Sequence, residues 1–274
     1  MAIIAISRGT FTGGQTLAER LAERLGYQCL GREELLEAAV AAYGIPVEKL
    51  RAAMDKPPSL WERLVSDRDI YLNYVRAMLC ERVRGDNLVF HSFVGHLLLP
   101  GISHVIRVRV IEDMESRIEA AVRRHHLERK DAIARIKKID RERSEWTRFL
   151  WGVDWQDPSL YDAVINLSRM GISGACELVA HMVELEAFKP TPQSLKAMED
   201  LALGSRVWAA LAMDSAVMGA GLKVEADDGV VTITGTVGSW EMVDAIPWVA
   251  RRVEGVKEVR CNVEVAAPIY EPPI

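Results

Sequence analysis

The hydrophobic pattern changes twice at the start of the chain. Residues 3–6 form an unbroken apolar run, as in a buried strand. Leu17, Leu21 and Leu25 then recur at every fourth position with charged residues between them, and Gly26 ends the series. The pattern predicts a buried strand, a short loop and an amphipathic helix.

Apolar runs and helical periods continue to alternate as far as residue 188. Short apolar runs predict further strands at 27–30, 87–91, 104–110 and 162–167. Helical spacing predicts helices at 32–42, 60–84, 112–126, 131–151 and 173–188. Strands that alternate with helices are typical of the α/β class, with a parallel sheet covered by helices on both faces.

The pattern changes character after the proline-containing segment 189–193. A predicted helix at 194–213 is followed by alternating strands at 222–225 and 230–234, a helix at 240–253 and a strand at 256–265. This order, α-β-β-α-β, predicts a smaller α+β module. We therefore expect a first domain at 1–188, a linker at 189–193, a second domain at 194–266 and a proline-rich tail at 267–274.

Composition supports a folded protein with two domains, because the 274 residues are 49% hydrophobic. The four cysteines are scattered and favour neither disulfides nor a zinc site, and the start of the chain lacks a basic leader. We expect a cytoplasmic protein. The net charge of −5 resides in the residues from Lys196 onward, whereas residues 107–148 hold 13 basic and 9 acidic residues. A basic segment in a neutral domain suits a nucleotide better than a nucleic acid.

The predicted loop carries a near-match to a phosphate-binding motif. Residues 9–16 read G-x-x-x-x-G-Q-T, which has glutamine where the pattern G-x-x-x-x-G-K-[ST] has lysine. The pattern predicts that backbone amides bind phosphates and that the Thr16 hydroxyl binds Mg²⁺. The alternative is a tight turn that needs glycine for its backbone angles. The candidate phosphate-binding residues are Gly9, Thr12, Gly13, Gly14, Gln15 and Thr16.

Phosphoryl transfer needs positive charge, and four arginines are candidates to supply it. Arg8 ends the first predicted strand and Arg32 follows the second. Arg141 and Arg143 lie in a long charged segment, two residues apart, so they do not share one narrow helix face. The alternative for this segment is a solvated helix whose charges balance.

Residues 1–188 resemble the cytidylate kinase-like family of P-loop nucleoside monophosphate kinases. The resemblance rests on residues 4–8 with Gly13 and Gly14, and on segments 137–143, 152–155, 157–162 and 165–171. It implies that ATP phosphates bind at residues 7–16 and that Arg141 and Arg143 close over the transferred group from a lid. It also implies that Asp162 and Arg169 lie near the nucleotide, with Arg32 on the substrate side.

Three positions depart from the pattern of the family. Gln15 stands where a basic residue is usual, Gly31 precedes Arg32 where the family has Asp-Arg, and His91-Ser92 replaces Gly-Arg. Each departure removes a charged contact to a substrate. Because loss of one fixed cation can cost orders of magnitude in rate, the resemblance predicts the fold more strongly than catalysis.

Residues 194–266 resemble a BON domain. The resemblance rests on the segments 228–237 and 253–259. It implies a protein or lipid ligand for this module. The acidic charge of the module argues against electrostatic docking on anionic lipid.

The sequence leaves three hypotheses. The first is an enzyme that uses ATP and Mg²⁺ to phosphorylate CMP or a related nucleoside monophosphate. The second is a catalytically degenerate nucleotide sensor that acts through its BON domain. The third is a structural assembly protein. In each case we expect a homo-oligomer that does not bind nucleic acid.

Overall fold

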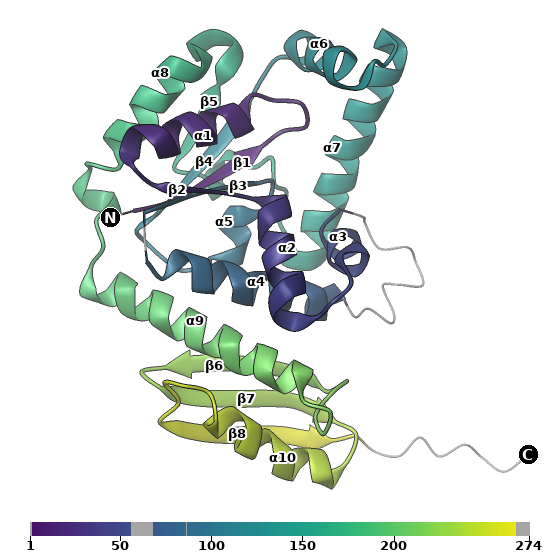
Figure 1. The fold of residues 1–274 in the computed structure, drawn as a ribbon, viewed down its shortest axis with the longest axis vertical. Coiled ribbons are helices and arrows are strands. Elements are labelled where there is room, and N and C mark those ends of the chain that lie inside the picture. Colours follow the sequence, from purple (N-terminus) through teal and green to yellow (C-terminus); the bar gives the residue numbers. More distant parts are fainter. Residues whose placement is uncertain (1, 56–67, 86, 267–274) are drawn as a thin grey trace, which may run out of the picture. The chain divides into compact units, whose positions relative to one another are not determined.

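The computed structural model describes residues 2–55, 68–85 and 87–266 (Figure 1). The chain forms two compact units, Met1–Leu195 and Lys196–Ile274. The division falls within helix α9 (Pro192–Met213), which begins inside the predicted linker. Among the described residues, no helix is long and apolar enough to cross a membrane.

The first unit is built on a five-stranded parallel sheet with the order β2-β3-β1-β4-β5. Its strands are β1 (Ile3–Arg8), β2 (Gln28–Gly31), β3 (Leu88–Ser92), β4 (Val105–Ile111) and β5 (Ala163–Asn166). The predicted parallel sheet is confirmed. β1 lies at its centre, so the loop that follows β1 opens at the middle of the carboxyl edge.

Helices cover both faces of this sheet, as predicted (Figure 1). Helices α1 (Gly14–Leu25) and α8 (Leu167–Met182) pack on one face. On the other face lie α2 (Arg32–Tyr43), α4 (Arg68–Val83) and the short α5 (Gly95–Leu98), and α3 (Val47–Asp55) packs on α2 and α4. Residues 60–67 of the predicted helix 60–84 lie outside the described residues.

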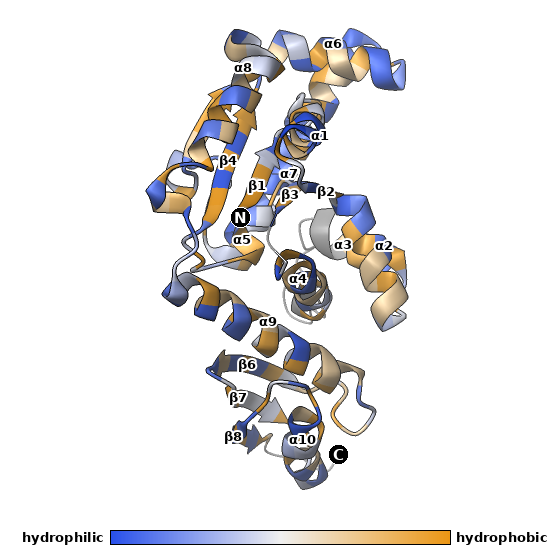
Figure 2. Cartoon of the chain, turned by 60° about the vertical axis from the view of Figure 1, so that its left-hand side comes forward, coloured by the Kyte–Doolittle hydropathy of each residue, from blue (hydrophilic) through white to orange (hydrophobic). Residues whose placement is uncertain are grey.

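Apolar side chains on both sides of the central strand form the core. Ile3 and Ile4 have no exposed surface although successive residues of a strand point to opposite faces, as expected for a strand covered on both sides. Hydrophobic colour runs along much of β1 and β4 (Figure 2). Leu17 and Leu21 of α1 are equally buried against the sheet. The helical period read from the sequence therefore identifies the buried face of α1.

Two helices, α6 (Met114–His125) and α7 (Arg129–Trp151), form a hairpin after β4. We call this element the helical hairpin. Asp113 caps α6 by accepting a hydrogen bond from the Ser116 amide at 2.9 Å, and Gly152 is the C-cap of α7. The hairpin has its own small core of Ile118, Ala121, Ala132 and Ile136.

The predicted helix 173–188 agrees with the structure at its start and differs at its end. Helix α8 is broken at Gly171, whose φ of 69° and ψ of 169° are not helical, so its main part begins directly after that residue. The turn before the break starts at Leu167 and is capped by Asn166, whose side chain accepts a hydrogen bond from the Ser168 amide at 3.0 Å. Helix α8 ends at Met182, and a separate 3₁₀ turn covers Glu186–Phe188.

The second unit has the predicted α-β-β-α-β order. After α9 come β6 (Gly221–Asp227), β7 (Val230–Val237), α10 (Trp240–Arg251) and β8 (Glu258–Val265). β7 pairs antiparallel with β6 and parallel with β8. Asp228 and Gly229 both have positive φ, 47° and 83°, as a tight hairpin turn requires.

Candidate functional site

The loop between β1 and α1, residues 9–13, turns at the carboxyl edge of the sheet. We call it the β1–α1 loop. The Thr12 hydroxyl donates to the Gly9 carbonyl at 3.0 Å and is buried, which fixes the turn from inside. The N-cap residue of α1 is Gly13, which has no side chain to bond to the amides of the first turn. The amides of Gly14, Gln15 and Thr16 are therefore placed to attract an anion at the helix start.

A glycine is required at the start of α1 because the Arg8 side chain crosses there. A Cβ placed on Gly14 would lie 2.7 Å from the Cβ of Arg8. The Gly-Gly pair therefore lets Arg8 lie against the helix start.

Arg8 is a cation held in a crowded, positively charged setting. Burial lowers the pKa of its guanidinium, and the nearby Arg32 and Arg124 lower it further. Its Nε is buried without a hydrogen-bond partner among the described residues. An anion beside Arg8 would offset the positive charge of its neighbours and give the buried Nε a hydrogen-bond acceptor.

The helical hairpin brings a second arginine to the same place. Nη1 of Arg143 donates to the Arg8 carbonyl at 3.2 Å. The guanidinium of Arg143 also lies over the ring of Phe93, 4.7 Å from its centroid. Arg141 is 70% exposed and lies beside Glu145, with Nε 3.9 Å from Oε1. The two candidate arginines therefore differ in position, as their spacing predicts.

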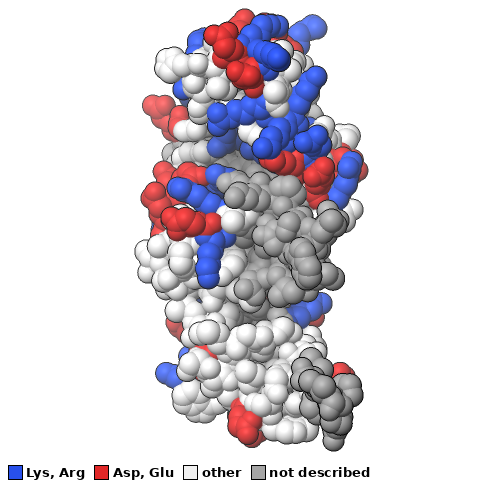
Figure 3. All heavy atoms as spheres, turned by 90° about the vertical axis from the view of Figure 1, so that its right-hand side faces the viewer, with Lys and Arg blue, Asp and Glu red and all other residues white. Residues whose placement is uncertain are grey.

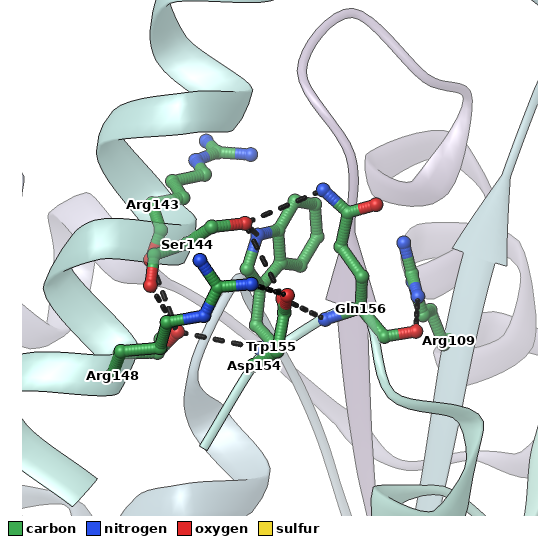
Figure 4. Close-up of polar contacts among 8 residues, drawn as sticks. Arg109, Arg143, Ser144, Arg148, Asp154, Trp155 and Gln156 are labelled. Atoms are coloured by element: carbon green, nitrogen blue, oxygen red, sulfur yellow. Dashed lines mark hydrogen bonds and ion pairs between the residues drawn. The ribbon is translucent and has the colours of Figure 1, made fainter. Parts of the chain in front are cut away.

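Trp155 lies beneath Arg143 and joins α7 to the sheet (Figure 4). Its indole Nε1 donates to Ser144 Oγ at 3.1 Å, and the ring is buried. Asp154 accepts from Arg148 at 2.5 Å and from the Gln156 amide at 3.0 Å. The guanidinium of Arg109 from β4 stacks on Trp155 at 4.8 Å. The segment 152–156 thus holds α7 next to β4 through contacts with Ser144, Arg148 and Arg109.

Two residues of this region were not predicted from the sequence. Arg117 of α6 donates to the Thr10 carbonyl and to Asp140 of α7, both within 2.9 Å. Glu112, the residue after β4, accepts a hydrogen bond from the Gly13 amide at 2.8 Å. The signal available for Glu112 was its position directly after a predicted strand, at the edge where the loop opens.

A cavity of about 330 Å³ lies between the β1–α1 loop and α6. Phe11, Thr12 and Gly13 form one side of it. On the other side Glu112 lies with α6 residues that include Arg123 and Arg124. Lys and Arg side chains gather over the upper part of the first unit, where α6 and α7 lie (Figure 3). The cavity therefore lies between the β1–α1 loop and a surface rich in Lys and Arg.

A family model for the cytidylate kinase-like family matches residues 3–169, which is more than half of the chain. The chain belongs to this family. A BON domain model matches residues 199–267. The domain order inferred from the sequence, a cytidylate kinase-like domain followed by a BON domain, is confirmed.

Similar proteins agree with the assignment to the cytidylate kinase-like family. A cytidylate kinase of Ignicoccus hospitalis is 25% identical over 185 residues, which cover 67% of this chain and 99% of that protein. A cytidylate kinase of Methanopyrus kandleri is 26% identical over 177 residues, 61% of this chain and 85% of that protein.

Among solved structures, an uncharacterized protein from Eubacterium ventriosum superposes with a TM-score of 0.52 at 22% identity. It covers 67% of this chain and 98% of its own. This likeness supports the fold of the cytidylate kinase-like domain.

Two motif positions of the cytidylate kinase-like domain lie at the start of α1. Gln15 is exposed, and its amide Nε2 donates to Glu19 Oε1 at 3.0 Å, along the helix surface. Thr16 is half-buried in the first turn. The Gln15 side chain therefore bonds within its own helix.

His91 lies near the carboxyl end of β3 in the cytidylate kinase-like domain. It is buried beside Gly31, where an added Cβ would lie 3.2 Å from the ring. Burial, assisted by Arg8, lowers the pKa of His91 to about 4. His91 is neutral at pH 7 and does not replace the cation that the family has in this region.

The remaining candidates have mixed surroundings. Arg32 Nη2 lies 2.6 Å from Glu33 Oε1, and the positive charge of Arg32 helps to lower the pKa of Arg8. Asp162 accepts from the Arg107 amide at 2.7 Å, at the amino end of β5. Arg169 is exposed in the first turn of α8. The structure thus brings Arg8, Arg32 and Arg143 together at the β1–α1 loop. Asp162 lies at the amino end of β5, the opposite edge of the sheet, where it bonds to a backbone amide.

Proposed function

We propose that the cytidylate kinase-like domain binds ATP at residues 9–16 and transfers its γ-phosphoryl group to CMP or a related nucleoside monophosphate. The observation that carries this proposal is the Arg143–Arg8 hydrogen bond of 3.2 Å. It brings a hairpin arginine to the loop where phosphates would bind. We assign residues 1–188 to this domain and 194–266 to the BON domain of a cytoplasmic protein.

The electrostatics of the loop support a polyanionic ligand. The amides of Gly13, Gly14, Gln15 and Thr16 lie at a helix start, where the partial positive charge favours phosphate. Arg8 supplies a guanidinium whose Nε lacks a partner among the described residues. Positioned cations and amides are the main requirement for phosphoryl transfer, because the protein forms no covalent bond to the group.

The cofactors ATP and Mg²⁺ fit this donor set. The unpaired Arg8 Nε and the loop amides suit phosphate oxygens. Thr16 would contribute its hydroxyl to Mg²⁺, which ordinarily takes few protein ligands and completes its shell with phosphates and water. The ion, when bound, would neutralise charge on the transferred group. On the acceptor side we assign Arg32 and Arg169 to the substrate. Asp162 lies at the amino edge of the parallel sheet, away from the β1–α1 loop, so its predicted place near the nucleotide is not retained in this proposal.

A second candidate function is a nucleotide sensor that signals through the BON domain to a protein or lipid ligand. Two observations favour it. Gln15 bonds to Glu19 along α1, and His91 is neutral. The loop then binds phosphates without the charges that accelerate transfer.

Turnover of the full-length protein with ATP, Mg²⁺ and CMP or UMP separates the two functions. Arg143→Ala is expected to lower turnover about a hundredfold or more. Arg141→Ala is the matched control on the same helix, and we expect a much smaller effect because that side chain is exposed. Wild-type nucleotide binding without turnover supports the sensor. The absence of any nucleotide-induced thermal shift contradicts both functions.

A further inference from the structure

Glu112 accepts a hydrogen bond from one of the backbone amides that the proposed function assigns to phosphate. Its Oε1 accepts the Gly13 N–H at 2.8 Å across 99 residues of sequence. The same oxygen would lie 3.1 Å from a Cβ placed on Gly13, so the carboxylate is packed directly against the loop. An anion belonging to the chain itself therefore caps the start of α1.

A carboxylate and a phosphate can each bind to the Gly13 N–H at the start of α1. Both are anionic acceptors that a helix N-terminus attracts. The Gly13 N–H can make one good hydrogen bond, and two anions held side by side repel each other. A phosphate that bonds to Gly13 must therefore displace Glu112.

We infer that Glu112 is a resident anion that competes with ligand phosphates for the Gly13 amide and so sets the nucleotide affinity of the loop. The inference rests on the proposed phosphate site. Glu112 is a determinant of binding, and the nucleotide enters as the carboxylate leaves.

The cavity beside the loop provides a second position for the carboxylate. Glu112 lines this cavity of about 330 Å³ together with Arg123 and Arg124 of α6. Both arginines are exposed. A guanidinium there can pair with the displaced carboxylate, which lowers the cost of the exchange. Glu119 lines the same cavity and provides a matched control.

The test is calorimetric titration of the full-length protein with ATP and, separately, with inorganic pyrophosphate. Glu112→Gln keeps the shape and an acceptor oxygen but removes the charge. Glu112→Ala removes both. We expect Glu112→Gln to bind about tenfold more tightly than wild type and Glu112→Ala at least as tightly, since each removes the competing charge. Glu119→Gln, which removes an equal charge from the same cavity, should change affinity less than about twofold.

The Gly13 amide resonance of ¹⁵N-glycine-labelled protein, without ligand, reports the contact itself. It should move in Glu112→Gln and stay in place in Glu119→Gln. Equal affinity of wild type and Glu112→Gln, or an unmoved Gly13 resonance, overturns the inference and leaves the proposed function standing. If no variant binds either compound, the proposed function fails and the competition falls with it.

Discussion

Arg117 donates from Nε to the carbonyl oxygen of Thr10 at 2.9 Å, and so bonds the helical hairpin to the β1–α1 loop. The same guanidinium bonds both oxygens of Asp140 at 2.8 and 2.9 Å. The two side chains are only 12% and 20% exposed. One arginine thus fixes the loop to α6 and α6 to α7.

We predict that Arg117→Ala weakens both nucleotide binding and stability. It leaves Asp140 partly buried without its cation, which costs about 1–3 kcal/mol of unfolding free energy. Urea denaturation measures the loss. Arg129→Ala is the control, because Arg129 forms its ion pair with Glu115 at an exposed site, where such pairs contribute less than about 1 kcal/mol. Equal losses in the two variants would contradict the structural role of Arg117.

A second prediction concerns the missing lysine. Gln15→Lys adds a cation at the start of α1 and should tighten ATP binding about tenfold through a charge-assisted contact. Gln15→Ala should leave affinity unchanged, since Gln15 bonds only to Glu19 at an exposed position. Calorimetry measures both. Unchanged affinity in Gln15→Lys would show that the new side chain lies along the helix as Gln15 does.

Turnover of the same variants and of Arg8→Ala then distinguishes an active kinase from a sensor. In a sensor, Gln15→Lys binds ATP more tightly but gains little activity, because the acceptor side still lacks charge at Gly31 and His91. In a kinase, wild type turns over and Arg8→Ala abolishes activity. Robust wild-type turnover that disappears in Arg8→Ala contradicts the sensor.

A third prediction follows from the glycine that Arg8 crosses. Gly14→Ala places a Cβ 2.7 Å from the Cβ of Arg8, which is close to the backbone and cannot swing aside. We expect a loss of about 1–3 kcal/mol in unfolding free energy, together with weaker nucleotide binding. Gly85→Ala is the control, because nothing lies within 4 Å of an added Cβ there. Denaturation and calorimetry that detect no change in Gly14→Ala would contradict the close contact.

The fourth prediction concerns stability at acid pH. Burial lowers the pKa of His91 to about 4 and that of His96 to about 3, against an ordinary value near 6.5. Below pH 6.5 the unfolded chain therefore binds more protons at these positions than the folded chain. Their contribution to stability is complete above pH 6.5 and is lost as pH falls toward 4. We expect a loss on the order of a few kcal/mol.

His96→Phe tests this dependence, because the His96 ring lies 4.6 Å from the Tyr161 ring in a tilted arrangement and both its ring nitrogens lack partners among the described residues. A phenyl ring keeps the packing and removes the titration. Urea denaturation at pH 7 and at pH 4.5 should show a smaller difference for this variant than for wild type. An equal difference would assign the acid sensitivity to other groups.

The sequence predicts the local structure well because strands, helices and turns are encoded over short distances. The period of Leu17 and Leu21 identifies the buried face of α1. The two-residue separation of Arg141 and Arg143 requires different faces of α7, although it does not say which faces inward. That choice is made by Phe93 and Trp155, on which Arg143 stacks.

The contacts that define the site could not be predicted in this way. Glu112 meets Gly13 across 99 residues, and Arg117 meets Thr10 across 107. Neither pair has a spacing or motif that indicates it, since the partners meet only after the sheet has formed. The short turn that precedes the break at Gly171 in α8 was not predicted for a local reason, because the capping role of Asn166 was not considered.

Phe11 attaches the tip of the β1–α1 loop to the helical hairpin. It adopts a positive φ of 58°, and its ring packs against the core of the helical hairpin and meets His125 edge-on at 5.3 Å. Pulling the hairpin away from the loop would return this aromatic surface to water, at a cost of about 1–2 kcal/mol. The tip of the β1–α1 loop and the two helices are therefore held together by a shared apolar contact, and separating them exposes the Phe11 ring.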